Sequence, residues 1–368
     1  MRISVDRSQV LAYRVKAHGL DRRGRRVDDL ALLDLGVQDT PSGSAYLALS
    51  ARLERAPEPS DSYALIWSLR GAPHYHRGTD LKRLAAQLYP VSDVDAFKRL
   101  FDVSPGLKKR GWTGLDAFAT AVETMRSVVT KPMSKGEASA AVTSELPREF
   151  SVDCRVCKAR HVREQTFRLS TLPAGLELEP GTSPPVLRPR KRRGTVTKRA
   201  AGAADLVDTY LRLNGPAGPD EVAWFFQTST SIARAIMPDD LAEIDVDGRT
   251  AWLPEDRVRA LRNAKAIRGV RLLPQSDGFT RVADRELMVP RKDDRDALYR
   301  TLGSPGGALV DGEIVGTWRA KTDRHRLAIT VTPFRRMPKA RRADLDGEAA
   351  RVASARGFDD VAVVVARP

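Results

Sequence analysis

Two cysteines and one histidine, Cys154, Cys157 and His161, lie within eight residues of one another. Two thiolates and one imidazole can occupy three corners of the tetrahedron that Zn²⁺ prefers. The sequence has no further cysteine, so a closed zinc site needs a fourth ligand such as Asp153 or Glu164. The spacing therefore fits a zinc site, and it also fits a reduced pair of small buried residues in a hairpin turn.

A run of basic residues forms a second chemical group. Seven Lys or Arg residues and no acidic residue lie between Arg188 and Arg199. Because prolines at 184, 185 and 189 exclude a regular helix in the first half, we interpret 181–204 as a linker or an exposed basic loop. It is either simply solvated or in contact with phosphates, and it holds no aromatic side chain for stacking on single-stranded bases. The candidate phosphate contacts are Arg188, Arg190, Lys191, Arg192 and Arg193.

The composition indicates a polyanionic partner. Lys and Arg outnumber Asp and Glu by 62 to 47, a net charge of +15. Such a charge favours nucleic acid, because neutralised phosphates release counterions, although codon bias in a GC-rich genome gives a similar composition. The apolar fraction of 42% is typical of a folded protein. We expect double-stranded DNA as the partner and no nucleotide cofactor, since no phosphate-binding glycine motif is present.

The expected location is the cytoplasm, in association with the nucleoid. The sequence contains no apolar run of the roughly 18 residues that cross a bilayer, and its first residues lack an apolar signal stretch. Two cysteines are too few for a disulfide framework and suit a reducing compartment. Membrane partners are therefore not expected.

The periodicity of apolar residues predicts an α+β chain of tandem winged-helix modules with a small C-terminal β-barrel. In the first module, 1–80, helices over 6–20, 27–38 and 45–53 precede a strand at 63–67 and a wing. In the second, 81–180, helices begin at Asp80, at 115 and at a capping box formed by Ser134 and Glu137. The segment 181–204 follows as the basic linker or loop.

The third module, 205–264, has the clearest pattern. Helices over 205–213, from Pro219 and over 230–237 precede a hairpin at 241–253 that turns at Asp247-Gly248. Only Arg234 on the last of these helices could read a base, which favours recognition of DNA backbone and shape over sequence. Strands at 269–274, 285–290, 307–318 and 325–334 suggest the barrel, 265–335. A helix at 345–356 and a strand at 361–365 end the chain, 336–368.

Four stretches make the sequence resemble a known family. LGVQD (35–39), WSLRGAPH (67–74), YLRLNGP (210–216) and LVDGEIVGTW (309–318) are similar to the winged-helix family of the alkylpurine DNA glycosylase AlkZ and its relative YcaQ. The resemblance implies tandem winged helices around a DNA-sized concave surface. It also implies a candidate monofunctional DNA glycosylase, which hydrolyses the N-glycosidic bond of an alkylated or crosslinked base. The alternative is a non-catalytic DNA-binding or regulatory protein.

The resemblance also implies a site, because those enzymes carry a Gln-x-Gln or Gln-x-Asp motif whose second polar residue positions water. Gln38 matches the first position, and Thr40 stands where the second Gln or Asp is expected. Asp39 is a carboxylate one place early, about 100° around a helix axis. The alternative is that these residues only end a helix. In the second stretch, Arg70 and His74 are candidates for DNA contact, or else internal packing residues. His76 and Arg77 are expected at the surface.

Overall fold

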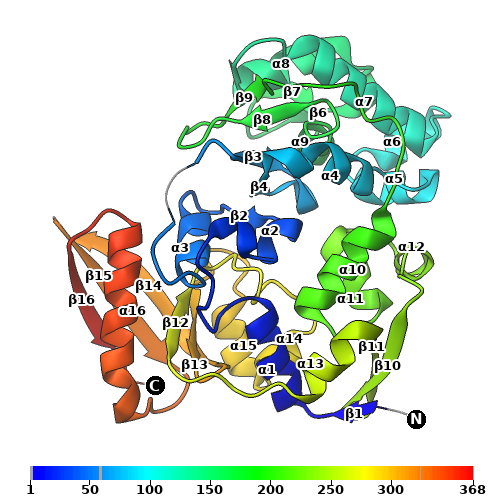
Figure 1. Cartoon of the computed structure of the whole chain (residues 1–368). Helices are drawn as coiled ribbons and strands as arrows, with labels where there is room; N and C mark the ends of the chain where they lie inside the picture. Colours follow the sequence, from blue (N-terminus) through cyan, green and yellow to red (C-terminus); the bar gives the residue numbers. More distant parts are fainter. Residues whose placement is uncertain (1–2, 58–59, 324, 368) are drawn as a thin grey trace. The chain divides into compact units, whose positions relative to one another are not determined.

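The computed structural model describes residues 3–57, 60–323 and 325–367. Its contacts divide the chain into two compact units that alternate along the sequence. Unit 1 comprises Met1–Pro59, Thr209–Glu221 and Asp239–Pro368, and unit 2 comprises Ser60–Asp208 and Val222–Pro238. Helices and strands are mixed in both units, which confirms the α+β prediction (Figure 1).

Unit 1 contains the first and the last segment of the chain. Its helices are α1 (Arg7–Ala17), α2 (Leu32–Leu35), α3 (Ser44–Ser50), α13 (Val258–Arg262), α14 (Arg285–Met288), α15 (Lys292–Leu298) and α16 (Arg342–Ala355). Its strands are β1 (Ile3–Val5), β2 (Val37–Gln38), β10 (Leu241–Val246), β11 (Arg249–Pro254), β12 (Val270–Leu273), β13 (Gly306–Val310), β14 (Glu313–Asp323), β15 (Arg326–Pro333) and β16 (Asp360–Val365). Two helices begin in one unit and end in the other, α10 (Ala203–Asn214) and α11 (Pro219–Phe226).

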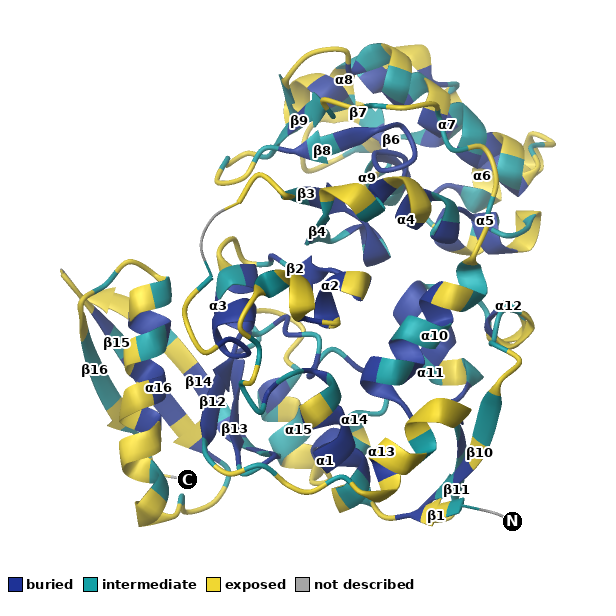
Figure 2. Ribbon diagram, in the orientation of Figure 1, coloured by how far each residue is buried: buried dark blue, intermediate teal, exposed yellow. Residues whose placement is uncertain are grey.

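A five-stranded sheet, β12-β13-β14-β15-β16, dominates the C-terminal part of unit 1. The strands β12 and β16 are its two edges, so the predicted small β-barrel is found only in part, and the predicted boundary between 335 and 336 separates β15 from β16. The final strand β16 pairs in parallel with β15, from Asp360 opposite Arg326 to Val365 opposite Val331. The helix α16 packs its apolar residues Leu345 and Ala349 against one face of the sheet. Figure 2 shows β12 and β13 as the most buried strands of this sheet.

Burial of β12 and β13 follows from packing on both faces. Leu272 and Ala308 belong to the core beneath α16, whereas Leu273 and Leu309 belong to a second core with α1. Alternate residues of a strand point to opposite faces, so a strand covered on both sides must be apolar throughout. This explains why 306–310 reads as a continuous run of small and apolar residues.

Unit 2 is built around one apolar core that includes Trp67, Phe118, Phe150 and Phe167. Its helices are α4 (Leu81–Gln87), α5 (Asp93–Arg99), α6 (Ser104–Lys109), α7 (Gly114–Val128), α8 (Lys135–Glu145), α9 (Glu164–Leu169) and α12 (Thr230–Ala235). Its main strands, β3 (Tyr63–Trp67), β4 (Pro73–Arg77), β5 (Met133–Ser134), β8 (Leu176–Leu178) and β9 (Val186–Pro189), run in the order β4-β3-β8-β9-β5. The strands β6 (Ser151–Cys154) and β7 (Ala159–Val162) form a separate hairpin. The predicted capping box of Ser134 and Glu137 is present at the start of α8.

Three predicted elements differ in the structure. The segment 285–290, predicted as a strand, starts with the helix α14, because Arg, Glu, Leu and Met all favour a helix. The predicted helix over 27–38 is interrupted at Leu30, which is extended, and its α-helical part is only α2, which ends at Leu35 because Gly36 takes a left-handed φ of 88°. Part of 181–204 is the strand β9, paired antiparallel with β8, and not an unstructured linker.

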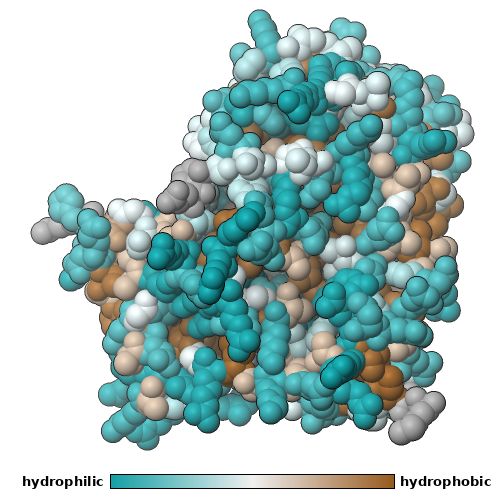
Figure 3. Space-filling model, viewed as in Figure 1, coloured by the Kyte–Doolittle hydropathy of each residue, from teal (hydrophilic) through white to brown (hydrophobic). Residues whose placement is uncertain are grey.

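The three helices and the hairpin predicted over 205–264 occur in the expected order, as α10, α11, α12, β10 and β11. Their assembly into tandem winged helices stays a prediction. The face shown in Figure 3 is largely hydrophilic, in keeping with the high content of charged residues. Among the described helices, we find none with the length and apolar character needed to cross a membrane.

Candidate functional site

Gln38, Asp39 and Thr40 lie between α2 and α3. Gly36 ends α2, Gln38 is the last residue of β2, and Thr40 lies in a bend. Asp39 is buried, whereas Gln38 and Thr40 on either side of it are partly exposed. The helix that we predicted through Gln38 is therefore wrong, and the three motif residues lie in non-helical backbone.

The carboxylate of Asp39 caps the start of α3. Its Oδ1 accepts the backbone N–H of Ala45 at 3.0 Å, and the N–H groups of Gly43 and Ser44 also point to this carboxylate. The cap position itself is Gly43, which has no side chain to supply such a bond. Burial raises the pKa of Asp39, and these three backbone bonds act in the opposite direction. Asp39 thus has a structural task at a helix N-terminus.

Thr40 carries an unsatisfied hydroxyl. Its Oγ1 is buried and has no hydrogen-bond partner among the described residues. Its carbonyl oxygen accepts a hydrogen bond from Gln275 Nε2 at 3.4 Å. A buried hydroxyl without a partner is unusual in a folded protein and marks a place where water or a ligand would be stabilised.

A hollow of about 270 Å³ adjoins this segment within unit 1. Pro41 and Ser44 line it on one side, and Pro274 and Gln275 on another. The basic side chains Arg319, Lys321 and Arg356 also belong to its lining. The hollow is therefore positively charged, which suits a polyanionic ligand.

A buried ion pair fixes the loop that brings Gln275 to Thr40. Arg52 donates to both carboxylate oxygens of Asp277, at 2.7 and 2.8 Å, and both side chains are fully buried. Arg52 also donates to the carbonyl of His18 at 2.8 Å. A planar guanidinium held by several acceptors has one orientation, so α3, α1 and the 274–280 loop are locked together.

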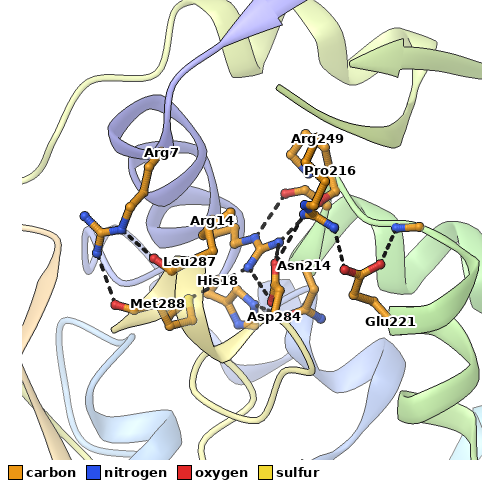
Figure 4. Close-up of polar contacts among 12 residues, drawn as sticks. Arg7, Arg14, His18, Asn214, Pro216, Glu221, Arg249, Asp284, Leu287 and Met288 are labelled. Carbon is orange, nitrogen blue, oxygen red and sulfur yellow. Dashed lines mark hydrogen bonds and ion pairs between the residues drawn. The ribbon is translucent and has the colours of Figure 1, made fainter. Parts of the chain in front are cut away.

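Figure 4 shows a second buried network below this loop. Arg14 donates to Asp284 at 2.6 Å and to the carbonyls of Gly215 and Pro216. His18 Nε2 lies 3.1 Å from Asn214 Oδ1, and burial lowers the pKa of His18 to about 3. A neutral imidazole beside these groups adds no charge to the network, which joins α1 to the end of α10.

Arg70 packs inside unit 2. Its NH1 donates to the carbonyl of Phe225 at 3.0 Å, and its guanidinium lies 4.8 Å from the centre of the Phe225 ring. A role of Arg70 in binding DNA stays a prediction.

His74 is buried, with its Nδ1 2.9 Å from the carbonyl of Ala72 and 3.1 Å from Ser68 Oγ. His76 lies 2.9 Å from the same Ser68 oxygen and is 1% exposed, so its predicted surface position is wrong. Desolvation of His76 lowers its pKa to about 3. Arg77 is half-buried beside Asp80.

The basic segment 188–193 divides into anchored and exposed residues. Arg188 pairs with Glu177 at 2.8 Å, and Arg193 donates to the carbonyls of Ala174 and Arg126. Lys191 and Arg192 are exposed. Arg190 is half-buried, and its Nε has no hydrogen-bond partner among the described residues.

Two further predicted groups lie in unit 2. Arg234 is exposed on α12. Cys154, Cys157 and His161 come together, with their ligand atoms within 4.8 Å of one another at the β6–β7 hairpin. The hairpin turn is as predicted, but Cys157 is exposed, which excludes the alternative of two buried packing cysteines. A backbone N–H of Cys157 and the His161 side chain lower the pKa of Cys154 to about 6.

Comparison with known proteins places these residues in a family. The family model described as DNA glycosylase AlkZ-like matches residues 32–355. The chain belongs to the AlkZ-like family of DNA glycosylases. The resemblance seen in the four sequence stretches is thereby confirmed.

Two relatives extend this result for the AlkZ-like chain. It is 28% identical over 184 residues to an interstrand DNA cross-link repair glycosylase of Streptomyces sahachiroi, a match over 48% of this chain and 46% of the relative. The match thus spans about half the length of that protein. The solved structure of Streptomyces sahachiroi DNA glycosylase AlkZ has a TM-score of 0.74 and 20% identity, over 99% of this chain and 100% of that one. This similarity shows a shared fold.

The sequence alone did not identify the polar residues that support the AlkZ-like motif. Gln275, Asp277 and Asp284 lie more than 200 positions from Gln38, in segments without a pattern of their own. Asn214 lies in one of the resembling stretches, which was the only available signal. Buried partners of this kind depend on tertiary contacts that periodicity does not reveal.

We expect Asp39→Ala to lower the free energy of unfolding by about 1 kcal/mol, because α3 loses its N-terminal acceptor. Asp39→Asn keeps an oxygen acceptor, so its effect should be only a few tenths of that value. Chemical denaturation of both variants measures the difference. Equal losses in the two variants would contradict the capping role.

Proposed function

We propose that this AlkZ-like protein is a DNA glycosylase that hydrolyses the N-glycosidic bond of an alkylated or crosslinked base. The observation that carries the proposal is the pair Gln38 and Thr40, which have the spacing of the family motif and are both partly exposed on either side of the buried Asp39. The unsatisfied Thr40 hydroxyl and the nearby amide of Gln275 add polar groups at the same place. Amide and hydroxyl groups can hold a water molecule for attack on the sugar.

The side chains at the motif indicate which kind of base can leave. Glycosidic bonds break through an oxocarbenium-like state, which a carboxylate would stabilise. Asp39 is engaged with the N-terminus of α3, so Gln38 and Thr40 act without it. A purine alkylated on a ring nitrogen carries a positive charge and leaves as a neutral base, and therefore needs little help from an acid. We expect such cationic lesions to be the substrates.

Double-stranded DNA would be held through its phosphates. Burial lowers the pKa of Arg193, and the neighbouring charges of Arg126 and Arg190 lower it further, which indicates a concentration of positive charge in unit 2. The exposed Lys191 and Arg192 lie in the same segment, and Arg234 offers one further cation on α12. Arg70 and His74 would act by holding the surrounding segment in place. Backbone contacts of this kind predict a steep dependence of affinity on salt.

Base release from a duplex with a single 7-methylguanine, and from one with an interstrand crosslink, tests the activity. The wild-type protein should release base, and Gln38→Ala and Thr40→Val should each slow release about 10²–10³-fold, the usual effect of removing one positioned polar group. Asp39→Asn, at the buried residue between them, is the matched control and should keep most of the activity.

Three outcomes would change the proposal. No release above buffer by the wild type, with salt-dependent DNA binding intact, would identify a non-catalytic DNA-binding protein. Loss of release in a folded Asp39→Asn variant would transfer the water-activating role to Asp39. Unchanged release in Gln38→Ala would remove the motif from the mechanism.

A further inference from the structure

The strands β6 and β7 form a hairpin with little apolar packing of its own. Ser151 pairs with Val162 and Cys154 with Ala159, and most residues between them are partly or fully exposed. Val156, at the turn, is 91% exposed. A two-stranded hairpin is only marginally stable in water unless something else holds it. Val162, at the end of β7, is buried in the core of unit 2, and its N–H donates to Thr143 Oγ1 of α8. It is therefore the exposed turn end of the hairpin that a further source of order would stabilise.

The three side chains at its open end have the chemistry to supply that order. The ligand atoms of Cys154, Cys157 and His161 all lie within 4.8 Å of one another. Zn–S bonds of about 2.3 Å and Zn–N bonds of about 2.0–2.1 Å place tetrahedral ligands roughly 3.5–3.8 Å apart. The Cys157 side chain is exposed and already contacts Cys154, so a small rotamer change would close the remaining gap.

The histidine already has the tautomer that a metal requires. His161 Nδ1 lies 2.8 Å from the carbonyl oxygen of Val162, which can only accept, so Nδ1 carries the proton. The lone pair is therefore on Nε2, and the imidazole also contacts Cys154. Metal-binding histidines are commonly oriented in this way by a backbone carbonyl at the second ring nitrogen.

The backbone of the turn is shaped around the first thiol. The N–H of Cys157 donates to the sulfur of Cys154 at 3.4 Å. Lys158, directly after the second cysteine, takes a left-handed φ of 51°. A non-glycine residue adopts that conformation only where its surroundings require it. Here it turns the chain so that His161 returns toward the two sulfurs.

We propose that Cys154, Cys157 and His161 bind one Zn²⁺, with water at the fourth position, and that the metal stabilises the β6–β7 hairpin. Binding deprotonates the two thiols and gives a neutral complex. The two carboxylates considered as a fourth ligand have basic neighbours. Glu164 pairs with Lys135 and Arg168, and Asp153 lies 3.7 Å from Arg148. The site is independent of the proposed glycosylase activity.

Metal analysis of the untagged full-length protein, purified with a phosphine reductant, tests the site. The wild type should hold one zinc per chain. Cys154→Ser, Cys157→Ser and His161→Ala should each fall to background, with circular dichroism showing that the fold is kept. Val156→Ala, an exposed non-ligand in the same turn, is the matched control and should keep its zinc. Cobalt substitution should give the strong visible absorption of a tetrahedral thiolate site in the wild type and in the control.

Trypsin supplies a second readout, since Arg155 and Lys158 flank Val156 in the turn. Chelation should speed cleavage there in the wild type and in Val156→Ala, and should change nothing in Cys157→Ser. Reduced wild type that holds no more zinc than the ligand variants, and shows no cobalt–thiolate absorption, would overturn the proposal. Full zinc content in Cys157→Ser would do the same. A disulfide that forms on air oxidation, in protein that binds no zinc when reduced, would identify a redox pair in its place.

Discussion

Asp277→Ala should lower the free energy of unfolding of unit 1 by about 3–5 kcal/mol, because removal of one partner leaves a buried charge unpaired. The remaining partner, Arg52, is fully buried and would keep only its bonds to the carbonyls of His18 and Ala48. Desolvation raises the pKa of Asp277 and the Arg52 charge lowers it, with a lowered pKa as the result. Chemical denaturation followed by fluorescence measures the loss.

Two variants control this prediction. Asp256→Asn breaks the Arg212–Asp256 pair, which is also short at 2.7 Å but has side chains 32% and 59% exposed, and it should change stability by less than about 1 kcal/mol. The double variant Arg52→Met/Asp277→Leu removes both charges and should recover much of the loss. If Asp277→Ala were no more destabilising than Asp256→Asn, the pair would not be holding the loop.

Stability should also fall steeply in mild acid, through two buried histidines. His18 in unit 1 and His76 in unit 2 both have a pKa lowered by burial from 6.5 to about 3. As the pH falls below 6.5, the two histidines bind protons in the unfolded chain but stay neutral in the folded chain. The free energy of unfolding present at neutral pH is therefore lost progressively down to about pH 3. At 1.36 kcal/mol per pKa unit, each histidine costs about 2 kcal/mol between pH 6.5 and 5.

Denaturation curves at several pH values check the histidine effect. His18→Gln and His76→Gln should each reduce the slope of stability against pH, and His325→Gln, at an exposed position, should leave it unchanged. Asp39 and Asp102 act in the opposite direction, since burial raises the pKa of both carboxyls. A slope unaffected by the two buried-histidine variants would show that carboxylates govern the acid transition.

Much of the secondary structure could be predicted from local signals. The capping box at Ser134, the Asp247-Gly248 turn and the apolar strand at 361–365 each depend on residues close in sequence, and each element is present. Errors occurred where local signals were weak. The segment 285–290 has no alternation, and β9 begins after prolines that we took as marks of a linker.

The candidate site could be predicted only as a short motif. Gln38 and Thr40 were found from the spacing, but the backbone that presents them depends on Gly36, whose φ of 88° ends α2 and is followed by the short strand β2. The role of Asp39 depends on the helix that follows it, and Gln275 arrives from a distant loop. Contacts of this kind are determined by the tertiary structure, and the periodicity of apolar residues in the sequence does not reveal them.

The alternation of the two units along the chain has a consequence for synthesis on the ribosome. The strand β1 is made first, yet its partner β10 is made about 240 residues later, with Ile3 opposite Ile244. Unit 2 is complete once residue 238 has left the exit tunnel, whereas unit 1 must wait for β16 near the end of the message. We expect unit 2 to acquire protease resistance on the nascent chain while residues 3–57 are still exposed to chaperones. Arrested nascent chains of increasing length would show this order.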